Sequence, residues 1–69
     1  MNSNEVEAMI RDVILHHGLP FQVVSVVSAQ GRWNVSVRDL NAGVMTFAIP
    51  DGRPLDMRVN IQQHLEAED

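Results

Sequence analysis

Cysteine is absent from this sequence of 69 residues. Disulfide bonds and thiolate metal sites are therefore excluded, and with them the usual stabilising elements of small secreted domains. A core of this size supplies about 3–5 kcal/mol of stability, and domains so small are often stabilised by a partner subunit when disulfides and metals are missing. We therefore expect oligomerisation to stabilise this protein.

Lysine is also absent, and nine acidic residues outweigh five arginines, for a net charge of −4. A dedicated nucleic-acid-binding domain needs a concentrated basic surface, so this balance argues against that class and is compatible with one local basic patch. The amino-terminal MNSNEVEAM has acidic residues where a signal peptide has basic ones. No apolar run approaches the ~20 residues of a membrane-spanning helix. We expect a cytoplasmic protein without membrane contact.

The first expected element is a helix over Asn4–His17. Asn4 is a suitable N-cap, with Glu7 three residues later in the capping-box position. Gly18 suits the left-handed position that ends a helix, and Leu19 can fold back on the last turn. One stripe recurs at the spacing of a helix face that packs on a core: Val6, Met9, Ile10, Val13, Ile14 and His17.

Three strands are expected next, over Phe21–Ser28, Arg32–Asp39 and Val44–Ile49. The first is rich in β-branched residues. In the other two, successive side chains alternate between larger apolar residues and smaller or polar ones, with the two-residue period of a strand. The tripeptide Ala29-Gln30-Gly31 fits a tight hairpin in which Gly31 supplies a positive φ. A turn-rich loop joins the second and third strands, so the three form an antiparallel meander.

The last segment has two interpretations. As a helix over Pro54–Ala67 it presents an apolar arc of Leu55, Val59, Ile61 and Leu65, whereas Leu55–Ile61 also alternates as a fourth strand would. The helix is favoured because the segment ends in helix-forming IQQHLEAE and is long for a strand. The sequence therefore predicts one α+β domain over residues 1–69, in the order α-β-β-β-α, with both helices packed on one face of the sheet.

The other face of this sheet is expected to be open. With a three-residue hairpin loop, the first strand turns Phe21, Val23 and Val27 inward and leaves Val24 and Val26 outside, and a two-residue loop exchanges the two faces. Either register leaves at least two valines on the open face. An apolar patch flanked by arginines is typical of an interaction site. The candidate interaction surface comprises Val24, Val26, Arg32, Asn34, Ser36, Arg38 and Thr46.

Residues with catalytic or metal-binding chemistry do not form a recognisable motif. His16 and His17 are adjacent on a helix, so their side chains diverge by about 100° and do not chelate one metal together. His64 stands alone near the end of the chain. Trp33 shares a strand face with Val35 and is expected in the core. We predict no enzymatic activity, no cofactor and no metal site.

The order of elements resembles the double-stranded-RNA-binding fold. Within it, the stretch FAIPDGRPLDMRVNIQQHL looks like the small HicA-type messenger-RNA interferase toxins, because it passes from a third strand through a proline-containing turn into a last helix. The resemblance implies the α-β-β-β-α fold. Those toxins place a catalytic histidine after a Gly-Ser near the second strand, where this chain has Gly31-Arg32-Trp33, so no functional residue is carried over.

Three hypotheses about function follow. The first is a non-enzymatic interaction protein that forms a homodimer, or binds another protein, through the open sheet face. The second is a nucleic-acid-associated module in which Arg32, Arg38 and Arg53 touch phosphates. The third is a small ribonuclease, related to the HicA-type toxins, that uses the three histidines.

Overall fold

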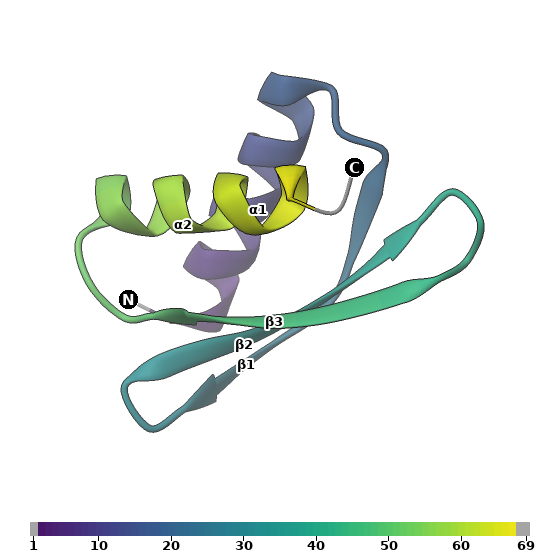
Figure 1. Ribbon diagram of the computed structural model, residues 1–69. Coiled ribbons are helices and arrows are strands. Elements are labelled where there is room, and N and C mark those ends of the chain that lie inside the picture. Colours follow the sequence, from purple (N-terminus) through teal and green to yellow (C-terminus); the bar gives the residue numbers. More distant parts are fainter. Residues whose placement is uncertain (1, 68–69) are drawn as a thin grey trace.

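The computed structural model, which describes residues 2–67, contains two helices and three strands in the predicted order α-β-β-β-α (Figure 1). The strands form one antiparallel sheet in the order β1-β2-β3, so β2 is central and the other two strands are edges. Leu55–Ile61, whose alternation also fitted a fourth strand, is helical. The elements are α1 (Ser3–His17), β1 (Phe21–Ala29), β2 (Arg32–Asp39), β3 (Val44–Pro50) and α2 (Pro54–Glu66).

The start of α1 differs from the prediction. The N-cap is Asn2, whose side-chain oxygen accepts a hydrogen bond from the backbone N–H of Glu5 at 2.9 Å. The expected cap, Asn4, lies inside the helix. Asn2 and Glu5 have the same three-residue spacing as Asn4 and Glu7, so the sequence offers two caps. The earlier one is used, and it lengthens the helix.

The end of α1 has the expected left-handed glycine and one unexpected consequence. Gly18 has φ 62°, and the N–H of Leu19 donates a hydrogen bond to the carbonyl of Ile14 at 3.0 Å. Leu19 and Ile14 both pack against the core. The prediction that His17 completes the apolar stripe is wrong, because His17 is exposed. The chain folds back here and Leu19 extends the apolar surface in its place.

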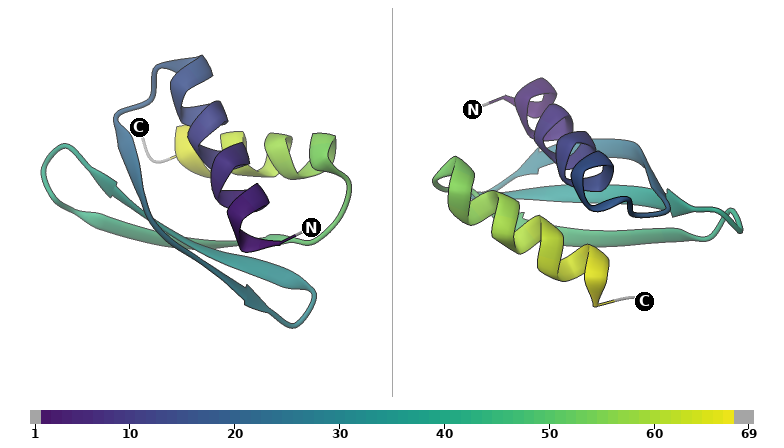
Figure 2. Two further views of the ribbon diagram at one scale, coloured as in Figure 1. Left: turned by 180° about the vertical axis from the view of Figure 1, so that it is seen from behind. Right: turned by 90° about the horizontal axis from the view of Figure 1, so that it is seen from above.

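Both helices cover the same face of the sheet, with α1 over the β1 side and α2 over the β3 side (Figure 2). Between these layers lie the largest fully buried side chains: Ile10, Ile49, Met57, Ile61, Leu65, Val6, Val35 and Val37. Each contributes about 1.5–3 kcal/mol relative to an exposed position. In α2 the buried stripe runs at every fourth residue, so Leu55 and Val59, expected on the apolar arc, are 73% and 46% exposed.

An ion pair joins the two helices. Arg58 of α2 donates a hydrogen bond to the carboxylate of Asp12 on α1. This hydrogen bond and the positive charge of Arg58 lower the pKa of Asp12 below its ordinary value of 3.8, and the nearby His16 lowers it further. The pair therefore favours the ionised carboxylate in the folded state.

A second long-range contact joins the loop between β3 and α2 to the start of β2. Trp33 is buried as predicted, with 6% of its surface exposed, and its indole N–H donates a hydrogen bond to the carboxylate of Asp51 at 3.2 Å. The backbone N–H of Asp51 donates to the carbonyl of Gly31 at 2.9 Å. The loop between β3 and α2 is thus attached to the hairpin between β1 and β2. Within residues 2–67, no helix is both long and apolar enough to cross a membrane.

Candidate interaction surface

The face of the sheet opposite the helices is uncovered (Figure 2). On β2, the residues at outward positions alternate with buried Trp33, Val35 and Val37. On β3, Met45, Phe47 and Ile49 face inward, as expected. Six of the seven predicted surface residues lie on the uncovered face: Val24, Arg32, Asn34, Ser36, Arg38 and Thr46.

The seventh, Val26, lies on the helix-covered face, so its predicted position is wrong. Val26 pairs with Val35 and packs against the core. The hairpin loop has two residues, because Ala29 pairs with Arg32. Val23 pairs with Val37 and Ser25 pairs with Ser36, so Val24 between them is an extra residue, a β-bulge. The alternation of β1 changes face at this bulge. A single register from the sequence therefore describes only one half of the strand.

The bulge explains why β1 is apolar on both faces. Before it, Phe21 and Val23 face the helices; after it, Val26 does so. The outward valines are Val24 and Val27, with exposed fractions of 48% and 55%. The expectation of two valines outside is confirmed, with Val27 in the place that Val26 was predicted to hold. Counting alternation from one end could not locate the extra residue.

On the uncovered face the central strand is polar, and the two edge strands carry both apolar and polar outward side chains. The outward residues of β2 are all polar or charged. Val27 lies on one edge strand, and Val44, 61% exposed, lies on the other. In the centre, the hydroxyl groups of Ser36 and Thr46 are hydrogen-bonded at 3.2 Å. This hydrogen bond pairs two of the outward hydroxyl groups, and Val27 and Val44 lie on either side of them.

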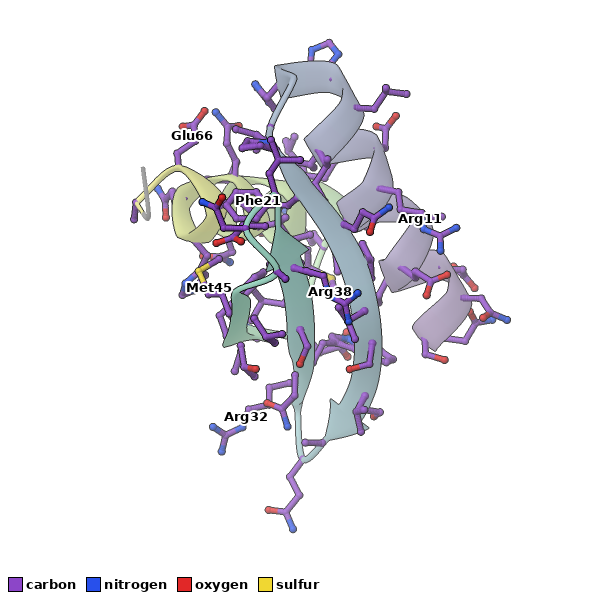
Figure 3. The ribbon with its side chains drawn as sticks, turned by 90° about the vertical axis from the view of Figure 1, so that its right-hand side faces the viewer. Arg11, Phe21, Arg32, Arg38, Met45 and Glu66 are labelled. Atoms are coloured by element: carbon purple, nitrogen blue, oxygen red, sulfur yellow. The ribbon has the colours of Figure 1, made fainter. Side chains whose placement is uncertain are left out.

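Two arginines mark the ends of this face. Arg32 pairs with Ala29 and Pro50, next to the β1–β2 hairpin, whereas Arg38 pairs with Gln22 and Val44 at the other end (Figure 3). Six residues of strand separate their Cα atoms by about 20 Å. Among the described residues, neither guanidinium forms an ion pair with a carboxylate. Their charges are thus available to a partner or to solvent.

The histidines are dispersed over the two helices. His16 and His17 are exposed and contact each other edge to face, with ring centroids 5.1 Å apart. The ring of His64 stacks on Phe47 of β3, at a centroid distance of 4.8 Å and an interplanar angle of 12°. That contact was not predicted, because nothing local relates two residues on separate elements. The described part of the chain holds no cluster of three or more histidine, aspartate or glutamate side chains suited to a metal ion.

Comparisons with known proteins do not extend these observations. No protein family matches the chain, and neither a curated protein nor a solved structure matches it. The case for a function therefore comes from the geometry of the surface.

Proposed function

We propose that the protein is a small, non-enzymatic interaction domain of the cytoplasm that self-associates through the uncovered face of its sheet. The observation that carries this proposal is the exposure of Val24, Val27 and Val44, which are 48–61% exposed on a sheet with helices on one side only. Apolar side chains gathered on one face mark interaction surfaces more often than isolated ones do. Burying this face would add apolar area to a core that a cysteine-free chain cannot strengthen by disulfides.

The positions of the arginines support a second copy as the occupant. Two sheets that pack face to face at an angle bring the middle of each strand to the centre of the interface and leave the strand ends at its rim. Arg32 and Arg38 lie at the ends of β2, so their charged groups would remain in solvent. Val24 and Val27 lie nearer the middle of the face, whereas Val44, opposite Arg38, would lie near the rim. A dimer formed in this way would have the charged, wet rim that is usual in protein interfaces.

A second candidate is a nucleic-acid-associated module. The topology is consistent with the double-stranded-RNA-binding fold, and three exposed arginines, Arg32, Arg38 and Arg53, are available for phosphates. Arg53 precedes α2, whose amino-terminal end carries the positive part of the helix dipole. Asp51 and Asp56 flank it, however, and weaken the local positive potential. A ribonuclease like the HicA-type toxins is the third candidate, and the topology is its one supporting observation.

Light scattering after size exclusion, over a series of protein concentrations, tests self-association directly. We expect a dimer, and we expect Val27→Glu to convert it to a monomer that keeps its fold, since this side chain is outside the core. Val59→Glu on α2, at a similarly exposed position away from the sheet face, is the matched control. A wild-type monomer at every concentration, or a dimer that tolerates Val27→Glu, would contradict the proposal.

The nucleic-acid candidate predicts a different result. Binding of double-stranded RNA that falls steeply with added salt would support it, because phosphate contacts release counterions. Absence of a mobility shift at low salt would remove it. Replacement of His16, His17 and His64 together would leave any RNA cleavage unchanged if the histidines take no part.

A further inference from the structure

The edge strand β1 has an unusual composition for its position. Its nine residues, FQVVSVVSA, include no charged side chain and no proline. Natural edge strands usually carry charges, prolines or bulges, because alternate residues of an edge point unpaired N–H and C=O groups outward and attract other strands. The bulge of β1 follows Val23, so the edge of Phe21–Val23 lies before it. β1 has a neighbour on one side only. Its free edge is therefore suited to accept an added strand.

A groove lies beside the first part of this edge, before the bulge. Its volume is about 660 Å³, and it lies between the carboxyl-terminal half of α1 and the start of β1. Leu15 on its α1 wall is 82% exposed, and Phe21 and Val23 are only partly buried. Figure 3 shows Phe21 at the start of β1 and Arg11 on the neighbouring α1. The lining residues are Arg11, Ile14, Leu15, Gly18, Leu19, Phe21, Gln22 and Val23.

The charge of the groove is positive, although the whole chain is acidic. Arg11 is the one charged residue among the described residues that line it. Its partner is Glu7, one turn earlier, at 3.4 Å, and this exposed pair within a helix is weak enough for an incoming carboxylate to replace it. The next carboxylate along α1, Asp12, is already bonded to Arg58. An acidic ligand would therefore compete with Glu7 for Arg11 and would meet no carboxylate among the residues that line the groove.

We propose that this groove binds an extended acidic segment of a partner protein, which adds to the free edge of β1 as a fourth strand. The backbone of the segment would pair with Phe21–Val23, alternate apolar side chains would lie against Leu15 and Leu19, and a carboxylate would face Arg11. Main-chain pairing supplies affinity in this mode of recognition, and the side-chain pockets supply specificity.

The composition of β1 also distinguishes this partner from a second copy of the chain. If two β1 strands paired with each other, each would offer the other a strand without any carboxylate, and neither Arg11 side chain would gain a partner from that strand. An acidic segment from another protein satisfies both the free edge and the arginine. The site is separate from Val27 and Val44, so it does not depend on the proposed dimer.

A library of random nine-residue peptides displayed on phage tests the proposal, with selection on the wild-type protein and counter-selection on Leu15→Glu. We expect the enriched peptides to combine alternating apolar residues with at least one aspartate or glutamate. A synthetic enriched peptide should bind Arg11→Glu at least roughly tenfold more weakly, the loss of one charge-assisted contact. The matched control for Leu15→Glu is Leu55→Glu on α2, which is 73% exposed and lies outside the groove, and which should bind like the wild type.

Backbone amide shifts locate the peptide. Perturbations centred on Phe21–Val23, lost when the peptide carries N-methyl groups at alternate residues, would support strand addition. Four results would overturn it: no enrichment, enriched peptides without acidic residues, binding unaffected by Leu15→Glu, or shifts confined to the uncovered sheet face. A dimer that dissociates on Leu15→Glu but not on Val27→Glu would also overturn it, because a second copy would then cover the groove. Dimer mass measured without peptide reports separately on the proposed function.

Discussion

Trp33 brings a polar group into the core, and a single distant residue satisfies it. Its indole nitrogen has one donor, and Asp51 is the acceptor, 18 positions later in the chain. A buried donor without an acceptor costs about 1–3 kcal/mol, whereas a satisfied one costs little. The placement of Trp33 could be predicted from the alternation of β2. Its partner could not, because Asp51 looks like an ordinary turn residue.

Asp51→Ala should therefore lower the free energy of unfolding by about 1 kcal/mol, because the part-buried indole N–H loses its acceptor. Asp51→Asn keeps an oxygen at this position and should lose less. Urea unfolding followed by the fluorescence of Trp33, the one tryptophan of the chain, measures both. Equal stability of wild type and Asp51→Ala would show that the hydrogen bond contributes nothing.

Among the elements, β1 separates what sequence patterns can predict from what they cannot. Its existence and limits follow from β-branched residues between Pro20 and the hairpin. Its faces do not, because Val23, Val24, Val26 and Val27 suit either side, and only contacts with β2 decide which face each takes. The bulge turns Val23 before it and Val26 after it towards the helices, and leaves Val24 and Val27 on the uncovered face. Similarly, Asn2 and Asn4 are equivalent N-cap candidates, so the sequence left two possible starts of α1, two residues apart.

Two single-residue deletions test this account of the bulge. Deleting Val24 should remove the bulge and keep Val26 opposite Val35, so the free energy of unfolding should change little. Deleting Val26 should also remove the bulge but bring Ser25 opposite Val35, which should cost about 1 kcal/mol more through lost apolar burial. Both variants have the same length, so loop entropy does not distinguish them. Equal stabilities in thermal or urea unfolding would contradict the observed register.

The contact between the helices predicts a dependence on pH. Since Arg58 lowers the pKa of Asp12 in the folded state below 3.8, the pair stabilises the fold fully above that pH, and the contribution disappears as pH falls through the lowered pKa. The stability difference between wild type and Asp12→Asn should thus be constant near neutral pH and vanish in acid. Added salt should reduce it, because both side chains are exposed.

Unfolding titrations of both proteins from neutral to acidic pH measure this difference. Arg58→Gln provides the control, since it should remove the same pH-dependent part and make a further Asp12→Asn change nearly neutral. A difference that stays undiminished in strong acid would contradict the sign of the shift. The ion pair could not be predicted from sequence, because its members are 46 positions apart on two helices whose relative placement depends on the whole core.

At the scale of the whole molecule, the layout leaves one sheet face and two strand edges without cover. The order of elements, the meander and the shared side of the helices all follow from hydrophobic periodicity and turn residues. The same patterns predict that valines of β1 face outward. They do not predict the groove beside the edge of β1, because its shape depends on how α1 ends. Leu15 and Leu19 form its walls only because the chain turns back at Gly18.

If the uncovered face joins two copies, stability must depend on protein concentration, because association favours the folded state by mass action. The urea midpoint of the wild type should rise over a roughly hundredfold range of concentration. The midpoint of Val27→Glu should stay constant and match the wild type at the lowest concentration, since this side chain supports no contact within one copy. Val59→Glu should behave like the wild type. A concentration-independent midpoint in a wild type that light scattering shows to be dimeric would mean that urea separates the copies before either unfolds, and the midpoint would then report the stability of the monomer alone.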